Sequence, residues 1–125
     1  MFYHFCQNNS GGTFERNHKS GISHHVIVEG TDADDIVSRA EAIGLYWDGV
    51  KEGRDCPCCG DRWDRPLDNL SLDTVPRLHD QNVSDGVYTP SGLTSRFDIW
   101  IKDGPEGYIH YMDGRVIPIE YGPSK

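Results

Sequence analysis

Three of the chain's four cysteines fall within four consecutive positions, in a stretch without hydrophobic periodicity. The stretch runs Cys56-Pro57-Cys58-Cys59-Gly60, and its Cys-Pro-x-Cys-Gly pattern is typical of a metal-binding knuckle. Pro57 restricts the chain after the first thiolate, and Gly60 tolerates the positive φ at which backbone amides point back at sulfur. Cys56 and Cys59 then converge on one ion, and Zn²⁺ is the ion expected for reduced thiolates. The pattern therefore predicts a structural zinc site in a loop.

The knuckle does not complete a zinc site alone, because a structural zinc takes four ligands. Cys58 is either a third ligand or a thiol that points away from the ion. His24 and His25 lie at the start of a valine-rich strand, which we expect beside a second short strand at 45–47 that leads into the knuckle. The two histidines are therefore candidates for the remaining ligands. The alternation along the strand does not decide which of them faces the cysteines.

A second pair of ligating side chains lies near the N-terminus. His4 and Cys6 share one face of the first expected strand and form the other candidate pair. Redox chemistry is disfavoured at the cysteine cluster, because the residues after Gly60 do not open a helix whose N-terminus would lower a thiol pKa. A catalytic zinc needs an open coordination position and a general base. Asp55 and Asp61 flank the cysteines, but they serve equally well as hydrogen-bond partners that position the ligands.

Length and composition predict a single domain, residues 1–125, with a thin hydrophobic core. The mean hydropathy is −0.61, and the chain contains 14 glycines and seven prolines. This composition implies many turns and argues against a helical bundle. A metal ion would help to stabilise so small a core.

The clearest predicted element is an amphipathic helix at about 32–43. Thr31 or Asp32 can cap its first turn, and Gly44 sits where a left-handed residue is expected to end it. Its apolar residues recur at three-to-four spacing, which places them on one stripe. These residues are Ala33, Ile36, Ala40 and Ile43.

The other predicted elements are strands. Alternating or continuous apolar runs predict them at 2–7, 23–29, 45–47, 97–101, 108–112 and 115–117. Asp113-Gly114 predicts a hairpin with a type I′ turn, and Pro118 predicts a strand end or a sheet edge. Residues 64–92 form a long irregular segment. Together the patterns predict an α+β fold, with a mainly antiparallel sheet, one helix and a zinc-knuckle loop.

The charge balance restricts the classes of partner. Twenty acidic residues against twelve basic residues give a net charge of −8, which disfavours nonspecific binding to nucleic acid. An acidic chain suits docking onto a basic protein surface. No apolar run approaches the roughly 20 residues of a membrane span, and no secretory signal is present, so we expect a reducing cytosol.

Several stretches occur together in an arrangement that resembles a family of small uncharacterised proteins encoded by tailed bacteriophages. The resemblance is carried by residues 3–5, a QNNSGG turn at 7–12, an SHHVIVE strand at 23–29, the runs 40–41 and 43–50, the DCPCCGDRW knuckle at 55–63, and the segments 103–106, 108–111 and 113–116. It implies a phage product acting in the cytoplasm of the infected bacterial host, and it supplies no reaction. The family pattern has all three knuckle cysteines but other polar residues at position 6. It therefore favours Cys58 and the His24-His25 pair over Cys6 as ligands.

No phosphate-binding loop, serine elbow or zinc-protease motif is present in the sequence. The leading hypothesis is a zinc-stabilised binder that occupies a basic surface of a host protein and modulates or inhibits it, for example in host defence. A zinc-dependent nucleic-acid-binding module is the alternative, with Trp47, Trp63 and Tyr111 as stacking platforms and Arg54, Arg62 and Arg65 as the basic cluster. A metal-dependent hydrolase that uses His24-His25, Asn69 and His79, or a virion component, remains as a further alternative.

Overall fold

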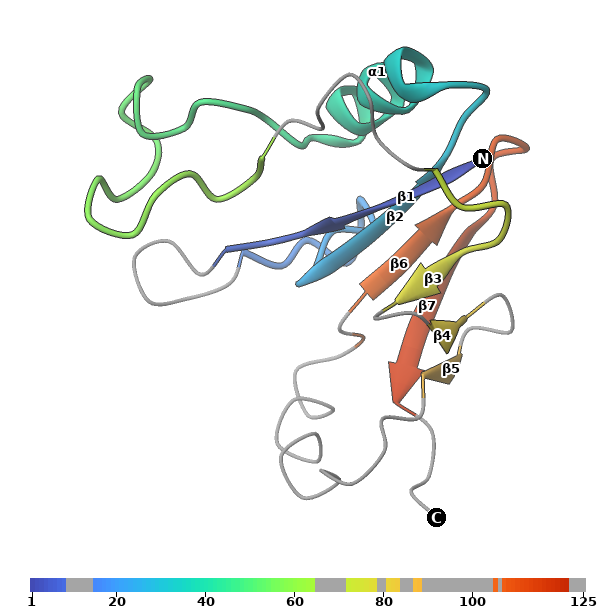
Figure 1. Cartoon of the computed structure of the whole chain (residues 1–125). Helices are drawn as coiled ribbons and strands as arrows, with labels where there is room; N and C mark the ends of the chain where they lie inside the picture. Colours follow the sequence, from blue (N-terminus) through green and yellow to red (C-terminus); the bar gives the residue numbers. More distant parts are fainter. Residues whose placement is uncertain are drawn as a thin grey trace.

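The structure of the protein, a computed structural model, describes residues 1–8, 15–64, 72–78, 81–83, 87–88, 105 and 107–121. Within these ranges the chain forms one helix and seven strands (Figure 1). In chain order they are β1 (Phe2–Cys6), β2 (His25–Glu29), α1 (Ala33–Ile43), β3 (Arg77–Leu78), β4 (Gln81–Asn82), β5 (Val87–Tyr88), β6 (Gly107–His110) and β7 (Val116–Tyr121). The fold is α+β, as predicted.

Five strands form one sheet in the order β1-β2-β6-β7-β5. The pairs β1–β2 and β6–β7 are antiparallel, whereas β2–β6 and β5–β7 are parallel. The four longest strands therefore make a mostly antiparallel sheet with one parallel pairing at its centre. Strands β3 and β4 pair with each other in a separate antiparallel hairpin.

Helix α1 begins and ends where its capping residues predict. The Asp32 side chain accepts a hydrogen bond from the Asp35 backbone N–H (2.8 Å), and Asp35 in turn accepts one from the Thr31 N–H (2.9 Å). At the other end Gly44 has a φ of 127° and donates its N–H to the carbonyls of Ala40 and Glu41. These contacts satisfy backbone groups that a helix end leaves without partners.

The sheet separates two hydrophobic clusters, because alternate residues of a strand face opposite sides. The helix side contains Phe5, Ile22, Val26, Val28, Ile36, Ala40, Leu45 and Trp63. The opposite side contains Phe2, Ile27, Leu78, Val83, Ile109 and Ile119. Phe2 and Phe5 of β1 lie on opposite sides, as do Ile27 and the two valines of β2, which follows from the alternation of faces along each strand. Figure 1 shows α1 lying over one face of the sheet.

The strand predicted at 45–47 does not form. After the helix, the Leu45 N–H donates to the Ala40 carbonyl, so this segment continues the helix cap and does not join a sheet. Asp48 follows with a left-handed φ of 56°, which an extended strand does not contain. The expectation that β2 lies beside residues 45–47 is therefore wrong, because its neighbours in the sheet are β1 and β6.

The hairpin predicted at Asp113-Gly114 is present, but its turn type differs. The Gly114 N–H donates to the Tyr111 carbonyl (3.1 Å), and the Tyr111 N–H donates to the Arg115 carbonyl (2.9 Å). Gly114 has a φ of 95°, whereas Asp113 keeps a negative φ. A type I′ turn needs positive φ at both central residues, so the loop is a type I turn followed by a left-handed glycine. Pro118 lies inside β7, opposite Tyr108, before β7 begins to pair with β5.

Part of the segment predicted as irregular, 64–92, is ordered into the short strands β3, β4 and β5. The strand predicted at 97–101 and the residues Arg65, Asn69 and His79 lie outside the described residues. Within the part of the chain that the structure describes, no helix has the length and apolar character needed to cross a membrane.

Candidate metal centre

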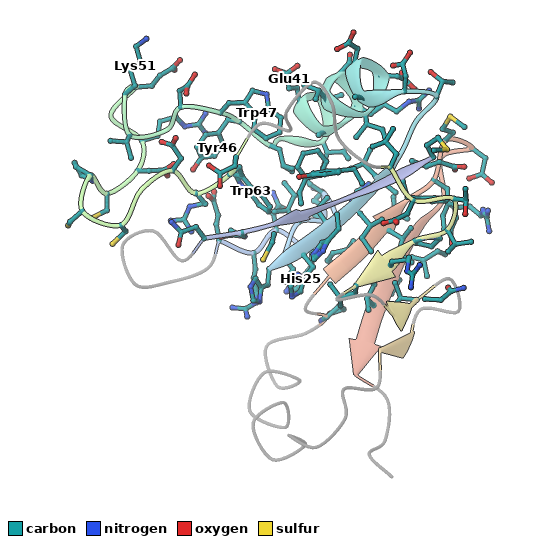
Figure 2. The ribbon with its side chains drawn as sticks, in the orientation of Figure 1. His25, Glu41, Tyr46, Trp47, Lys51 and Trp63 are labelled. Atoms are coloured by element: carbon teal, nitrogen blue, oxygen red, sulfur yellow. The ribbon has the colours of Figure 1, made fainter. Side chains whose placement is uncertain are left out.

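Residues 45–64 form a long loop that carries three of the cysteines and contains no helix or strand. The loop folds through local backbone turns: the Arg54 and Asp55 N–H groups both donate to the Gly49 carbonyl (2.7 and 3.0 Å). The Cys59 and Gly60 N–H groups donate to the Cys56 carbonyl (3.2 and 3.1 Å). Gly60 has a φ of 89°, as predicted for the glycine of a knuckle. Figure 2 shows Lys51 at the outer end of this loop.

A buried carboxylate holds the loop together. The side chain of Asp55 is fully buried. It accepts hydrogen bonds from the Tyr46 hydroxyl and from the Arg62 backbone N–H, each at 2.8 Å. The Arg62 guanidinium lies 3.7 Å from the same carboxylate, which offsets its charge. Asp55 therefore joins the beginning of the loop to its end.

Two further contacts fix the two halves of the loop. The Asp61 carboxylate accepts a hydrogen bond from the Val50 N–H (2.9 Å), and the Arg54 guanidinium stacks 3.6 Å above the centre of the Tyr46 ring. Gly49 has no space for a side chain, because a Cβ there would lie 1.8 Å from Asp55 Oδ2. Asp55 and Asp61 thus serve as structural hydrogen-bond acceptors within the loop.

The loop is also attached to the end of β1. Asn8 donates its side-chain amide to the carbonyls of Cys59 (2.7 Å) and Asp61 (3.3 Å), and its backbone N–H to the Arg62 carbonyl (2.8 Å). Trp63, with only 2 % of its surface exposed, inserts into the helix-side core. These contacts place the cysteine turn beside the end of β1.

The thiol cluster, which we define as Cys56, Cys58 and Cys59, gathers three sulfur atoms within 4.8 Å of one another. The Cys56 and Cys58 sulfur atoms are 3.1 Å apart, compared with about 3.8 Å for two thiolates on one tetrahedral zinc. Hydrogen bonds from the Cys58 and Cys59 thiols and backbone N–H groups lower the pKa of Cys56 to about 7. The adjacent Cys56 sulfur raises the pKa of Cys58. The three side chains can hold a metal ion.

A second group of ligating side chains lies on the sheet, on the face opposite α1. His4, Cys6 and His25 place one ligand atom each within 4.8 Å of the others, and this group too can hold a metal ion. The His4 Nε2 and His25 Nδ1 atoms are 2.7 Å apart. His24 lies beside them, with its Nε2 3.8 Å from the Cys6 sulfur and its ring stacked on that of His25. We call His4, Cys6, His24 and His25 the sheet cluster.

The predicted ligands therefore occupy two places. The structure brings Cys58 together with Cys56 and Cys59. It brings His25 together with His4 and Cys6, the pair that the sequence offered separately. Figure 2 shows the reason: His25 lies on one side of β1 and β2, whereas Tyr46, Trp47 and Trp63 lie on the side of the helix and the loop.

The family model "Domain of unknown function (DUF7296)" matches residues 1–125. The chain belongs to this family. No curated protein and no solved structure matches the chain. Because the match covers the whole chain, both clusters belong to the DUF7296 domain.

The aromatic and basic residues that suggested nucleic-acid binding are largely engaged inside the DUF7296 domain. Trp63 is buried, and the Trp47 ring stacks on Phe5 while its Nε1–H donates to Glu41 (3.1 Å). The Arg62 guanidinium donates to the Gln7 side chain (2.8 Å). The expectation that Trp63 is an exposed stacking platform is wrong, because its ring completes the core beneath the loop.

Proposed function

We propose that this protein is a binding protein that uses zinc as a structural element of its 45–64 loop. In this proposal it occupies a basic surface of a bacterial host protein and modulates or inhibits that protein. One observation carries the argument: both carboxylates next to the thiol cluster, Asp55 and Asp61, are bound to groups of the loop itself. They hold the cysteine turn in shape and are not placed as a general base beside an ion.

The chemistry of the donors supports zinc as the ion. Thiolates are soft ligands, and a turn with three of them suits Zn²⁺ better than the hard cations Mg²⁺ or Ca²⁺. Zinc binding releases the thiol protons, and the low pKa of Cys56, about 7, reduces that cost at neutral pH. Residues 48–62 of the loop contribute no side chain to either hydrophobic cluster, so an ion would supply stabilisation that the core does not.

The distribution of charge supports a basic partner surface. Helix α1 and its N-cap carry four carboxylates against a single arginine, Arg39. Asp32, Asp34 and Glu41 are exposed, and the salt bridge of Arg39 is with Asp35. The outer face of α1 is therefore acidic and accessible, and it complements a basic surface. The resemblance to tailed-phage proteins makes the host cytoplasm the expected setting and a host protein the expected partner.

The zinc is tested with untagged protein purified under reducing conditions. We expect elemental analysis to find zinc, and a strong chelator to lower the melting temperature. The double variant Cys56→Ser/Cys59→Ser should bind one zinc ion fewer than wild type and show a smaller chelator effect, whereas Cys6→Ser, outside the loop, should keep the loop ion. A protein that is metal-free and melts at the same temperature with and without chelator would contradict the proposal.

The partner is tested by pull-down from bacterial lysate followed by mass determination. Wild-type protein should recover a basic host protein, and Asp34→Asn/Glu41→Gln on the helix should weaken its recovery severalfold. Glu52→Gln/Asp64→Asn is the matched control, because it removes the same charge from exposed positions on the loop. Equal losses from both double variants would assign the effect to net charge and not to the helix face. Recovery of no protein would contradict the binding function.

A further inference from the structure

We propose that the sheet cluster is a second metal site, distinct from the thiol cluster. In this site His4, Cys6 and His25 bind a divalent transition-metal ion of the Zn²⁺ type, and His24 supplies the fourth ligand. The site does not depend on the zinc proposed for the loop. Its ligands come from β1, from β2 and from the residue that precedes β2.

The strand register brings the ligands together. Cys6 and His25 are directly opposite each other in the antiparallel β1–β2 pair, and His4 lies opposite Ile27. Opposite residues of an antiparallel pair point to the same face, as do residues two apart in one strand. His4, Cys6 and His25 therefore share one face as a consequence of backbone pairing. Because β1 and β2 are hydrogen-bonded along their whole length, the ligands are held on a rigid support.

The ligand atoms of His4, Cys6 and His25 lie within 4.8 Å of one another, so these three residues fit a tetrahedral ion after a small adjustment. Typical zinc bond lengths place two ligating nitrogens about 3.3 Å apart, and a nitrogen and a thiolate about 3.6 Å apart. The Cys6 sulfur and His24 Nε2 are already 3.8 Å apart. His4 Nε2 and His25 Nδ1, at 2.7 Å, need to separate by roughly 0.6 Å to share an ion. Side-chain rotation is sufficient for a change of this size.

The hydrogen bond between the two histidine rings also supports a metal site in the sheet cluster. A direct contact between two ring nitrogens requires that one carries hydrogen and the other a lone pair, so the His4–His25 pair shares one proton at that contact. A metal ion can replace this proton, because neutral imidazole and thiolate are the forms that bind metals. His25 is 3 % exposed, whereas Cys6 is exposed. The ion would therefore enter from the Cys6 side and be held from within by His25.

The two sites differ in ligand type, and this difference makes them separable in an experiment. The sheet cluster offers mainly imidazole with one thiolate, whereas the thiol cluster offers only sulfur. Co²⁺ is a spectroscopic substitute for Zn²⁺, and its thiolate charge-transfer absorption grows with the number of bound sulfur atoms. The triple variant Cys56→Ser/Cys58→Ser/Cys59→Ser leaves Cys6 as the only thiol of the chain.

We expect the metal-free, reduced triple variant to bind one Co²⁺ per chain, with the charge-transfer absorption of a single thiolate. Adding Cys6→Ser should abolish this absorption, and adding His25→Ala should weaken Co²⁺ binding at least tenfold. His18→Ala is the matched control, because His18 contacts Tyr108 and lies outside the cluster. A folded triple variant that binds no Co²⁺ would overturn the proposal.

If the triple variant does not fold, the wild-type chain gives the same answer by stoichiometry. Wild-type protein should bind two Co²⁺ ions and Cys6→Ser one fully ligated ion, since Cys6 is exposed and its substitution spares both cores. An unchanged titration in Cys6→Ser overturns the sheet site. Loss of the only bound ion in Cys6→Ser supports the sheet site and instead contradicts zinc in the loop.

Discussion

The thiol cluster and the sheet cluster are built in opposite ways. The three thiols lie within one turn of chain, so their proximity needs only local backbone hydrogen bonds and a left-handed glycine. The residues of the sheet cluster are about 20 positions apart and meet because β1 pairs with β2. Sequence-local ligands can gather in an otherwise weak loop, whereas sequence-distant ligands require a formed sheet.

The support beneath each cluster differs as well. The loop around the thiols depends on polar contacts that converge on Asp55, and Trp63 is its principal anchor in the core. The sheet cluster stands on strands whose central residues Val26, Ile27 and Val28 are at most 1 % exposed. We therefore expect the loop to be sensitive to single polar or steric changes, and the sheet cluster to tolerate them.

Gly49→Ala should have the largest effect on stability. The new methyl group would stand 1.8 Å from Asp55 Oδ2 and 2.9 Å from a Tyr46 ring carbon, so the buried carboxylate must leave its partners. Disruption of a buried charged contact costs about 3–5 kcal/mol. Urea unfolding should show this loss, and limited proteolysis should cut the loop first.

Gly53→Ala is the matched control in the same loop. A methyl group at Gly53 meets no atom within 4 Å, so its cost comes from the left-handed φ of 76° alone. That cost is about 1–2 kcal/mol. Equal destabilisation by the two substitutions would show that the loop is not closed around Asp55.

Asp55→Asn should have the next largest effect. The amide keeps the shape of the carboxylate, but it removes the charge that faces Arg62 and turns one acceptor into a donor. Hydrogen bonds to a charged group are worth about 1.5–3 kcal/mol each, so a loss of about 2–3 kcal/mol is expected in urea unfolding. Glu15→Gln is the control, because Glu15 is the exposed partner of Arg62, and it should change stability by at most about 0.5 kcal/mol.

Cys56 should react faster than Cys6 in the metal-free, reduced protein. Its pKa is lowered to about 7, whereas desolvation raises the pKa of the Cys6 thiol. A larger fraction of Cys56 is thiolate near neutral pH, although a thiolate of lower pKa is less nucleophilic. Together these effects predict alkylation about tenfold faster at Cys56 than at Cys6. Peptide mapping after a short iodoacetamide pulse measures both rates. Similar alkylation rates would contradict the difference in thiol pKa between Cys56 and Cys6.

The smallest effect concerns the pH dependence of the sheet. Burial lowers the pKa of His110, and its hydrogen bond to the Gly21 carbonyl (2.8 Å) only partly opposes the shift. The unfolded chain therefore binds a proton more readily, so stability is complete above about pH 6.5 and falls as the pH decreases below it. Urea midpoints between about pH 7.5 and 5 should show this slope, and His110→Gln should flatten it. An unchanged slope in His110→Gln would contradict the assignment of this pH dependence to His110.

Local features of the fold could be predicted from the sequence. Asp32, Gly44 and the apolar stripe between them define α1, because capping and amphipathicity act over a few residues. The alternation in β1 and β2 assigned their faces for the same reason. The strand expected at 45–47 was wrong. The aromatic composition of this segment is typical of a strand, but the Leu45 backbone continues the helix cap and the Tyr46 hydroxyl bonds to Asp55 within the loop.

The candidate sites follow the same division. The three cysteines predict a metal-binding turn. Nothing in the sequence shows whether Asp55 holds the two ends of the loop together or lies beside a bound ion. The alternation of residues in the first strand places His4 and Cys6 on one face. The same alternation in β2 places His25 on one face of that strand, and this pattern could have linked His25 to the pair. That signal remained ambiguous because the register of β1 against β2 was unknown.

The sequence by itself determined the helix, the faces of the first strands, the thiol turn and the acidic charge, since each depends on neighbouring residues. Only the tertiary structure decided that β2 lies between β1 and β6, that Asp55 is buried, and that His25 meets His4 and Cys6. The physical reason is that pairing between distant segments is fixed by the total free energy of the packed sheet. No short stretch of sequence contains that quantity.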